Sequence, residues 1–257
     1  MTHDRFAVGT PLGGQCEYGV KSHGLIIMIN WDIALLTNLC FSSFLFAVCT
    51  SFTPTKNNDW VKSNFGVDLP TGYPPEAYPG YLAPLAVRSR SSGRVACGLA
   101  SFGLVPHWAK DSKISRHTYN ARVETVSVKP SYRDAWKHRQ FGLVLVDRFF
   151  EPDYGQGKPV RWQIGLESEE PFGIACLWET AQLANDQAPI VSFTMLTVNA
   201  DHHPVMNQFH KTEDEKRTPL AIPQEHFMDW LSADHEQAMG MLSASLMPNL
   251  VASEFKA

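Results

Sequence analysis

The chain has 257 residues, enough for one large domain or two small ones, and its hydrophobic fraction of 44% excludes wholesale disorder. The formal net charge of −4 excludes the global basic field of many nucleic-acid-binding proteins, so any contact with nucleic acid has to be local. The five cysteines include no CxxC pair, which favours reduced thiols over a disulfide framework. Cys97 and Cys176 fall in predicted strands and are expected to be inert.

Residues 1–47 are expected to be an N-terminal extension of doubtful origin. Residues 25–49 are apolar, but Asp32 interrupts them, and a central aspartate costs about 3 kcal/mol in a membrane span. Three interpretations stay open: a mis-assigned start upstream of a true start at Val48, a signal-like leader, and a buried or interfacial helix. We predict that the functional domain comprises residues 48–257.

Strands clustered in sequence, with helices at intervals, predict an α+β domain built on an antiparallel sheet. In chain order the sequence predicts a helix at 55–65, a proline-rich loop at 69–84, strands at 85–87 and 95–102, a helix at 129–139, strands at 141–150, 160–166, 172–178, 193–198 and 218–222, and helices at 223–231 and 236–246. Ser131 is the expected cap of the helix at 129–139. The apolar run at 141–150 is expected to be buried on both faces.

Four segments carry side chains suited to chemistry. They are Cys49 after its apolar leader, FGLVPHW at 102–108, YNARVET at 119–125 with DRFFEP at 147–152, and FHKTEDEKRTPLAI at 209–222. Together they resemble the SRAP family, the SOS response-associated peptidase or abasic-site processing proteins. The resemblance spans roughly residues 49–230, and NARxET is its most specific motif. It implies a mainly antiparallel sheet or barrel with flanking helices.

The resemblance also implies an activity and its residues. Family members expose an N-terminal cysteine that bonds to the aldehyde of an abasic site in single-stranded DNA, giving a thiazolidine crosslink. By position, Cys49 is then the nucleophile and Asn120 holds the opened sugar. Glu151 assists proton transfer at the sugar and the cysteine amine, and His210 acts as acid and base on the Schiff base. Arg122 contacts phosphate.

Further DNA contacts are expected from Trp108, Arg148 and Phe149. Trp108 offers a ring for base stacking, and Arg148 replaces a basic contact that this sequence has lost. No GxGxxG, P-loop or HExxH motif is present, and no metal or other cofactor is expected. His202 and His203 lack the spacing of a metal site and are expected to be loop residues.

The chemistry requires Cys49 to be the first residue of the mature protein. A terminal cysteine carries an amine and a thiol on adjacent carbons, so an imine formed by the amine is closed to a ring by the thiol. That closure is intramolecular, with an effective molarity on the order of 10⁵ M or more. A terminal amine has a pKa of about 8, which leaves a useful neutral fraction. An internal cysteine gives only a labile hemithioacetal.

Taken singly, each of these residues has a simpler interpretation. A lone cysteine such as Cys49 is usually a small buried hydrophobe, and Asn120 can simply cap a loop. A glutamate that ends a strand, as Glu151 is predicted to do, is normally solvated, and His210 in its polar segment is expected to be exposed. Glu124 is expected to pair with an arginine rather than to react.

The sequence departs from the family pattern in several places. The usual Met-Cys-Gly-Arg start reads Val48-Cys49-Thr50-Ser51, so the glycine and the arginine are missing. The tryptophan that usually follows the glutamate is Pro152, and acidic residues lengthen the segment between His210 and Arg217. These changes keep the four reactive groups and alter the DNA-binding groove around them.

Two further functions stay open. One is a cysteine peptidase or autoprotease that uses Cys49, His210 and Asn120 and needs no free amine. The other is a noncatalytic envelope lipoprotein whose leader is a true signal. For the favoured function we expect a cytoplasmic monomer whose partner is single-stranded DNA with abasic sites and whose mature domain does not contact a membrane.

Overall fold

A computed structural model describes residues 50–256, apart from residues 156, 184–187 and 212. These residues belong to one compact unit. Cys49 and the expected extension at 1–47 lie outside the described residues. Within the described part, none of the helices has the length and apolar character needed to cross a membrane.

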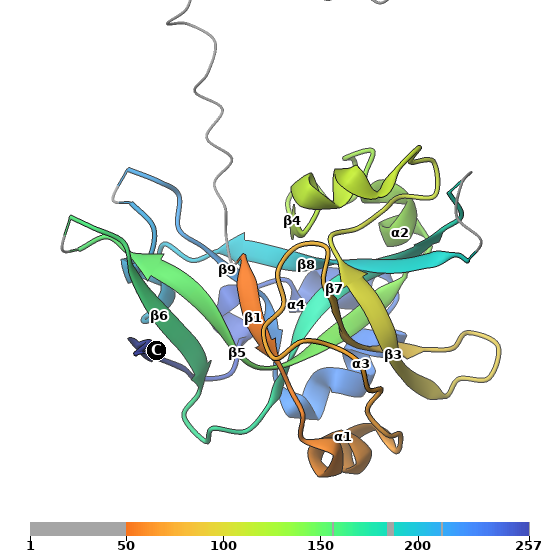
Figure 1. The fold of residues 1–257 in the computed structure, drawn as a ribbon, viewed down its shortest axis with the longest axis horizontal. Coiled ribbons are helices and arrows are strands. Elements are labelled where there is room, and N and C mark those ends of the chain that lie inside the picture. Colours follow the sequence, from red (N-terminus) through yellow and green to blue (C-terminus); the bar gives the residue numbers. More distant parts are fainter. Residues whose placement is uncertain (1–49, 156, 184–187, 212, 257) are drawn as a thin grey trace, which may run out of the picture. The chain divides into compact units, whose positions relative to one another are not determined.

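The described chain is dominated by strands, with a few short helices (Figure 1). The strands are β1 (Ser51–Pro54), β2 (Leu82–Arg88), β3 (Val95–Phe102), β4 (Asn120–Arg122), β5 (Phe141–Asp153), β6 (Val160–Leu166), β7 (Phe172–Ala181), β8 (Ile190–Asn199), β9 (Arg217–Pro219), β10 (Ala221–Ile222) and β11 (Leu250–Glu254). The α-helices are α1 (Asn58–Phe65), α2 (Arg133–Lys137), α3 (Phe227–Ser232) and α4 (His235–Met241).

The strand pairings close on themselves as a barrel. Strand β5 pairs with β7, β7 with β8, β8 with β3, β3 with β2, and β2 with β5 again. Two of the sheet's pairings, β3–β8 and β4–β8, are parallel and the others are antiparallel. The prediction of an α+β fold on a mainly antiparallel sheet is therefore confirmed.

Strand β5 separates two hydrophobic clusters, because successive side chains of a strand point to opposite faces. Leu143 and Leu145 belong to the outer cluster, which includes the helix residues Trp60, Trp136 and Trp230. The inner cluster contains residues from each strand of the closed circuit, among them Ala83, Phe102, Val144, Ile174 and Phe193. The prediction that the run at 141–150 is buried on both faces is confirmed, apart from the half-buried Asp147 and the exposed Arg148.

Several element boundaries differ from prediction for local reasons. Helix α1 begins only at Asn58, because the side chain of Asn57 caps it by accepting from the Trp60 N–H at 3.0 Å. The predicted helix at 129–139 is limited to α2, and the residue before it is Tyr132, which makes no capping bond. The expected cap at Ser131 was therefore wrong; Pro130 restricts the backbone there and lacks a donor.

The remaining differences concern strand limits and short elements. Strand β2 begins at Leu82, inside the predicted loop at 69–84, and β5, β7 and β8 extend beyond their predicted limits. The helix predicted at 223–231 begins with the 3₁₀ turn Gln224–His226 and becomes α-helical in α3. The last predicted helix ends at Met241, and the segment 244–246 is a separate 3₁₀ turn. Strands β1, β4 and β11 were not predicted, because runs of three to five residues carry too little periodicity.

Candidate functional site

A β-bulge in β5 turns Glu151 toward the interior of the barrel. In the pairing with β1, Thr53 lies opposite Arg148 and Pro54 opposite Val146, so Asp147 is an extra residue. The bulge therefore puts Val146 and Phe149 on the same inner face despite their odd separation. Glu151, two residues after Phe149, follows on that face and is only 1% exposed. Without the bulge it would point outward.

Glu151 and His210 form the centre of the candidate site. Oε2 of Glu151 lies 3.6 Å from Nε2 of His210, and the two side chains are 1% and 11% exposed. The separation allows an ion pair but exceeds a good hydrogen bond. A carboxylate and an imidazole at this distance, sheltered from water, can exchange protons with a group placed beside them.

The backbone of His210 is held in an uncommon conformation. Its φ of 64° lies in the left-handed region, which non-glycine residues rarely adopt. Its N–H donates to the Pro152 carbonyl at 3.3 Å, and its own carbonyl accepts from Nζ of Lys216 at 3.2 Å. These contacts fix the imidazole beside the end of β5 and offset the backbone strain.

Burial lowers the pKa of the His210 imidazole below its ordinary value of 6.5. A hydrogen bond with the Arg217 backbone and the charge of Asp214 act in the opposite direction, while Lys216 adds to the lowering. The net direction favours the neutral form of the His210 imidazole. A neutral imidazole can accept a proton, so His210 is suited to act as a base.

Neighbours of the four predicted catalytic positions meet in the inner cluster. The cluster includes Phe52, Phe149 and Phe209, and Tyr119 packs against it. In sequence these residues lie close to Cys49, Glu151, His210 and Asn120, respectively. The ring of Phe102 joins two of them, with centroids 5.2 Å from Phe52 and 5.8 Å from Tyr119. Segments far apart in the chain are thus anchored to one aromatic core.

Asn120 lies at the start of β4, which runs parallel to β8. Its carbonyl accepts a hydrogen bond from the Tyr132 hydroxyl at 3.0 Å, which fixes the strand against the segment that leads into α2. Asn120 and Arg122 are two residues apart in the strand, so their side chains project to the same side.

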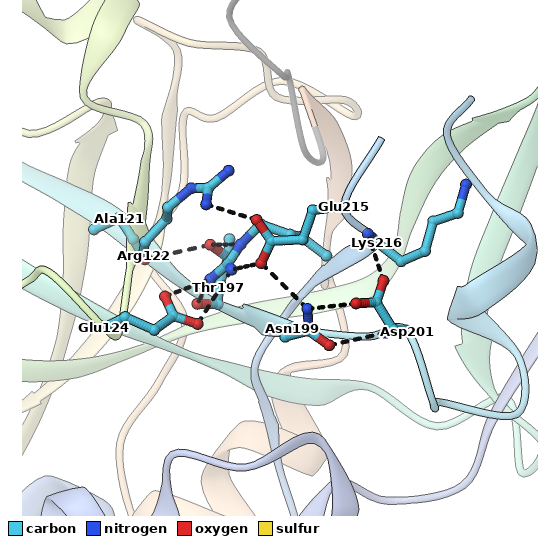
Figure 2. A network of polar contacts seen from close by, with 9 residues as sticks. Ala121, Arg122, Glu124, Thr197, Asn199, Asp201, Glu215 and Lys216 are labelled. Carbon is cyan, nitrogen blue, oxygen red and sulfur yellow. Dashed lines mark hydrogen bonds and ion pairs between the residues drawn. The ribbon is translucent and has the colours of Figure 1, made fainter. Parts of the chain in front are cut away.

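Arg122 is part of a network of polar contacts at the ends of β4, β8 and β9. Its Nη1 donates to Oε2 of Glu215 at 2.7 Å, and Figure 2 shows the two side chains directed at each other. Arg217, only 1% exposed, donates from both terminal nitrogens to Glu124 at 3.1 and 2.9 Å. The prediction that Glu124 pairs with an arginine is confirmed.

The start of β1 is held by Arg161 of β6. Its Nη2 donates to Oγ of Ser51 at 3.1 Å and to the carboxylate of Glu76, and its guanidinium lies over the ring of Phe150, 3.7 Å from the centroid. The family pattern has an arginine at this position, whereas here the residue is a serine that is contacted by an arginine from another strand. Ser51 lies opposite Phe150, the residue before Glu151.

The three residues predicted to contact DNA differ in their exposure to solvent. Trp108 is 48% exposed and offers a free face, and Arg148 is exposed on β5, where it donates to Gln163 at 2.7 Å. Phe149 is fully buried and packs against Phe172, with centroids 6.4 Å apart. The prediction that Phe149 contacts DNA was therefore wrong, because its ring belongs to the barrel core.

Other reactive side chains of the described part are held in structural roles. Burial raises the pKa of the Cys97 thiol to about 12 and raises that of Cys176 as well, which agrees with the expectation that both are inert. The ring of His203 accepts from the N–H groups of Val205 and Met206, both at 3.1 Å. No group of metal-binding side chains occurs among the described residues.

Two contributors to the site were not predicted from the sequence, and one buried pair away from it was not predicted either. Arg161 and Glu215 reach it only through pairing between distant segments, and nothing in their local sequence marks them. His107 has its Nδ1 2.6 Å from Oε1 of the buried Glu179, beside the exposed Trp108.

Comparisons with known proteins identify relatives of this chain. A family model described as "SOS response associated peptidase (SRAP)" matches residues 48–256. Two Bacillus subtilis (strain 168) proteins are similar in sequence: abasic site processing protein YoqW and abasic site processing protein YoaM. Each is 29% identical to this chain over an alignment that covers 72% of this chain, and the alignments cover 80% of YoqW and 79% of YoaM.

Solved structures share the fold. A crystal structure of a Bordetella bronchiseptica protein matches with a TM-score of 0.73 at 28% identity, covering 81% of this chain and 100% of that chain. A crystal structure of a Bacteroides thetaiotaomicron protein matches with a TM-score of 0.65 at 18% identity, covering 81% and 92%. The second similarity shows the fold alone.

Proposed function

Because the chain belongs to the SOS response-associated peptidase (SRAP) family, we propose that it processes abasic sites in DNA by forming a thiazolidine crosslink through Cys49. The observation that carries this proposal is the buried pair of Glu151 and His210, 3.6 Å apart at the inner face of the barrel. These two side chains supply the proton transfers that the reaction needs.

The start of β1 supports the role of Cys49. Ser51 lies opposite Phe150, which directly precedes Glu151. Cys49 precedes Ser51 by two residues in the sequence, so the proposal assigns the crosslinking amine and thiol to the segment that leads into β1.

The reaction proceeds in two balanced steps. The Cys49 amine adds to the aldehyde carbon of the ring-opened sugar, and loss of one water leaves a C=N bond. The thiol sulfur then adds to that carbon, its proton passes to nitrogen, and a five-membered ring closes. One C–N and one C–S bond form, and no oxidant or reductant takes part. Glu151 and His210 move the protons, and Asn120 holds the sugar.

The test uses protein that begins at Cys49 and single-stranded DNA from which uracil has been removed enzymatically. We expect an adduct that survives a denaturing gel, with a mass equal to protein plus DNA minus one water. Cys49→Ala should abolish it. An equally stable adduct in Cys49→Ala would refute the proposal.

A retained N-terminal extension separates crosslinking from the alternative peptidase activity. The extension removes the free amine of Cys49 but leaves its thiol. Under our proposal the extended protein does not crosslink to abasic DNA. Peptide cleavage by the extended protein, dependent on Cys49 and His210, would instead support the peptidase.

A further inference from the structure

We propose that Glu215 is an intramolecular competitor for DNA at Arg122, where its carboxylate occupies the place of a backbone phosphate. This inference rests on the proposed function, from which it takes DNA as the ligand of Arg122. Oε2 of Glu215 accepts from Nη1 of Arg122 at 2.7 Å (Figure 2). A carboxylate and a phosphate offer the same kind of acceptor to a guanidinium, so the two exclude each other there.

The buried cation of the network does not require the charge of Glu215. Arg217 is already neutralised by Glu124, which it contacts through both terminal nitrogens. It also donates to the carbonyl of Thr197 at 2.7 Å. Glu215 adds one hydrogen bond to Arg217 at 2.6 Å, which a neutral amide oxygen at this position can also accept.

Arg122 is also too exposed to need the Glu215 carboxylate as compensation for a buried charge. The side chains of Arg122 and Glu215 are 45% and 36% exposed, and ion pairs at such exposure contribute little to stability. The main physical consequence of the pair is that it neutralises a cation. Arg122 lies two residues from Asn120 on the same side of β4, so this neutralisation takes place beside the proposed sugar site.

The position of Glu215 in the sequence fits this interpretation. It belongs to the acidic segment that lengthens the chain between His210 and Arg217. The segment is fixed to the turn after β8, where Asn199 donates to Oε1 of Glu215 at 3.2 Å and Asp201 accepts from the Lys216 N–H at 2.9 Å. The carboxylate is thus held at Arg122 by its own segment.

The test measures binding of the full chain to an undamaged single-stranded oligonucleotide over a range of salt concentrations. Glu215→Gln should raise affinity about 5- to 10-fold at low salt, because one phosphate contact is gained. It should also steepen the plot of log K against log salt by about 0.7, the value for one phosphate on a single strand. Thermal unfolding should be close to that of the wild type.

Two matched variants complete the design. Glu213→Gln makes the same charge change on the same segment without an Arg122 contact, and should leave the salt slope unchanged. Arg122→Ala combined with Glu215→Gln should lose the gain in affinity. Equal gains from the two glutamine variants would mean a general charge effect and would overturn the proposal, as would unchanged, weaker or undetectable binding by Glu215→Gln. This binding test uses undamaged DNA and does not depend on crosslinking. A failure to crosslink abasic DNA in the separate experiment would therefore count against the proposed function and not against the role of Glu215.

Discussion

The carboxylate of Glu151 lies 3.6 Å from the imidazole of His210, although the two residues come from a strand and a turn almost sixty positions apart. Both groups are sheltered from water, and the backbone N–H of His210 bonds to the carbonyl of Pro152, the residue after Glu151. This relationship joins the two segments that carry the acid–base chemistry of the proposed reaction.

Removing the Glu151 carboxylate should slow crosslinking without unfolding the protein. Glu151→Gln preserves volume and loses only the proton exchange, so we expect a decrease in rate of about 100-fold, within the usual range for general acid–base catalysis. The measurement is a single-turnover time course with abasic single-stranded DNA. Glu179→Gln, at a buried carboxylate of another strand, is the control and should react at nearly the wild-type rate. A wild-type rate for Glu151→Gln would remove Glu151 from the mechanism.

Acid should destabilise the protein through its buried imidazoles. Burial lowers the pKa of His210 and of His203 below 6.5, so the unfolded chain binds more protons than the native one when the pH falls below that value. Their contribution to stability is complete above pH 6.5 and is lost as the pH falls through the lowered pKa values. Each imidazole changes the free energy of unfolding by at most about 1.4 kcal/mol per pH unit.

Denaturant unfolding between pH 7 and pH 5 measures this slope. His210→Asn, whose side chain tolerates a left-handed backbone, should flatten it. His202→Asn, at an exposed neighbouring position, is the control and should leave it as in the wild type. An unchanged slope in His210→Asn would contradict the burial argument.

The buried and exposed aromatic residues should respond in opposite ways. Phe149→Ala should lower the free energy of unfolding by about 3–5 kcal/mol, because it empties part of the barrel core. Trp108→Ala should change stability by less than about 0.5 kcal/mol. It should nevertheless weaken single-strand binding by about 1–3 kcal/mol, the usual contribution of base stacking. Weakened DNA binding by Phe149→Ala in a protein of normal stability would restore the original prediction for that residue.

Arg161 should hold β1 in register. Arg161→Ala removes the hydrogen bonds to Ser51 and Glu76 and the stacking on Phe150, so we expect a loss of about 1–2 kcal/mol and faster hydrogen exchange of the β1 amides. Arg161→Lys keeps the charge but not the planar contacts and should recover part of the loss. Unchanged exchange in β1 would show that its pairing with β5 suffices.

Much of the fold could be predicted because the limits of many helices and strands are set by residues next to them in the sequence. The strands at 95–102 and 160–166 were predicted with their observed limits, since turn-forming residues precede both. The bulge at Asp147 could not be predicted in this way, because an extra residue in one strand is defined only by its partner. That single residue decides that Glu151 points inward and that Arg148 points to solvent.

The candidate site was predicted only in part for the same reason. The chain order of the motifs identified Glu151 and His210, which the structure brings together. The contacts of Arg161 with Ser51 and of Glu215 with Arg122 depend on how distant segments pair. Buried aromatic residues such as Phe149 cannot be told from stacking platforms in sequence, because both are large and apolar.

The most direct test of the account is to identify the residue that carries the DNA. Protein beginning at Cys49 is reacted with an abasic single strand, the DNA is digested to its sugar remnant, and peptides are fragmented in a mass spectrometer. We predict a remnant bonded to both the nitrogen and the sulfur of Cys49. A remnant on a lysine, such as Lys211 or Lys216, with Cys49 unmodified would contradict it.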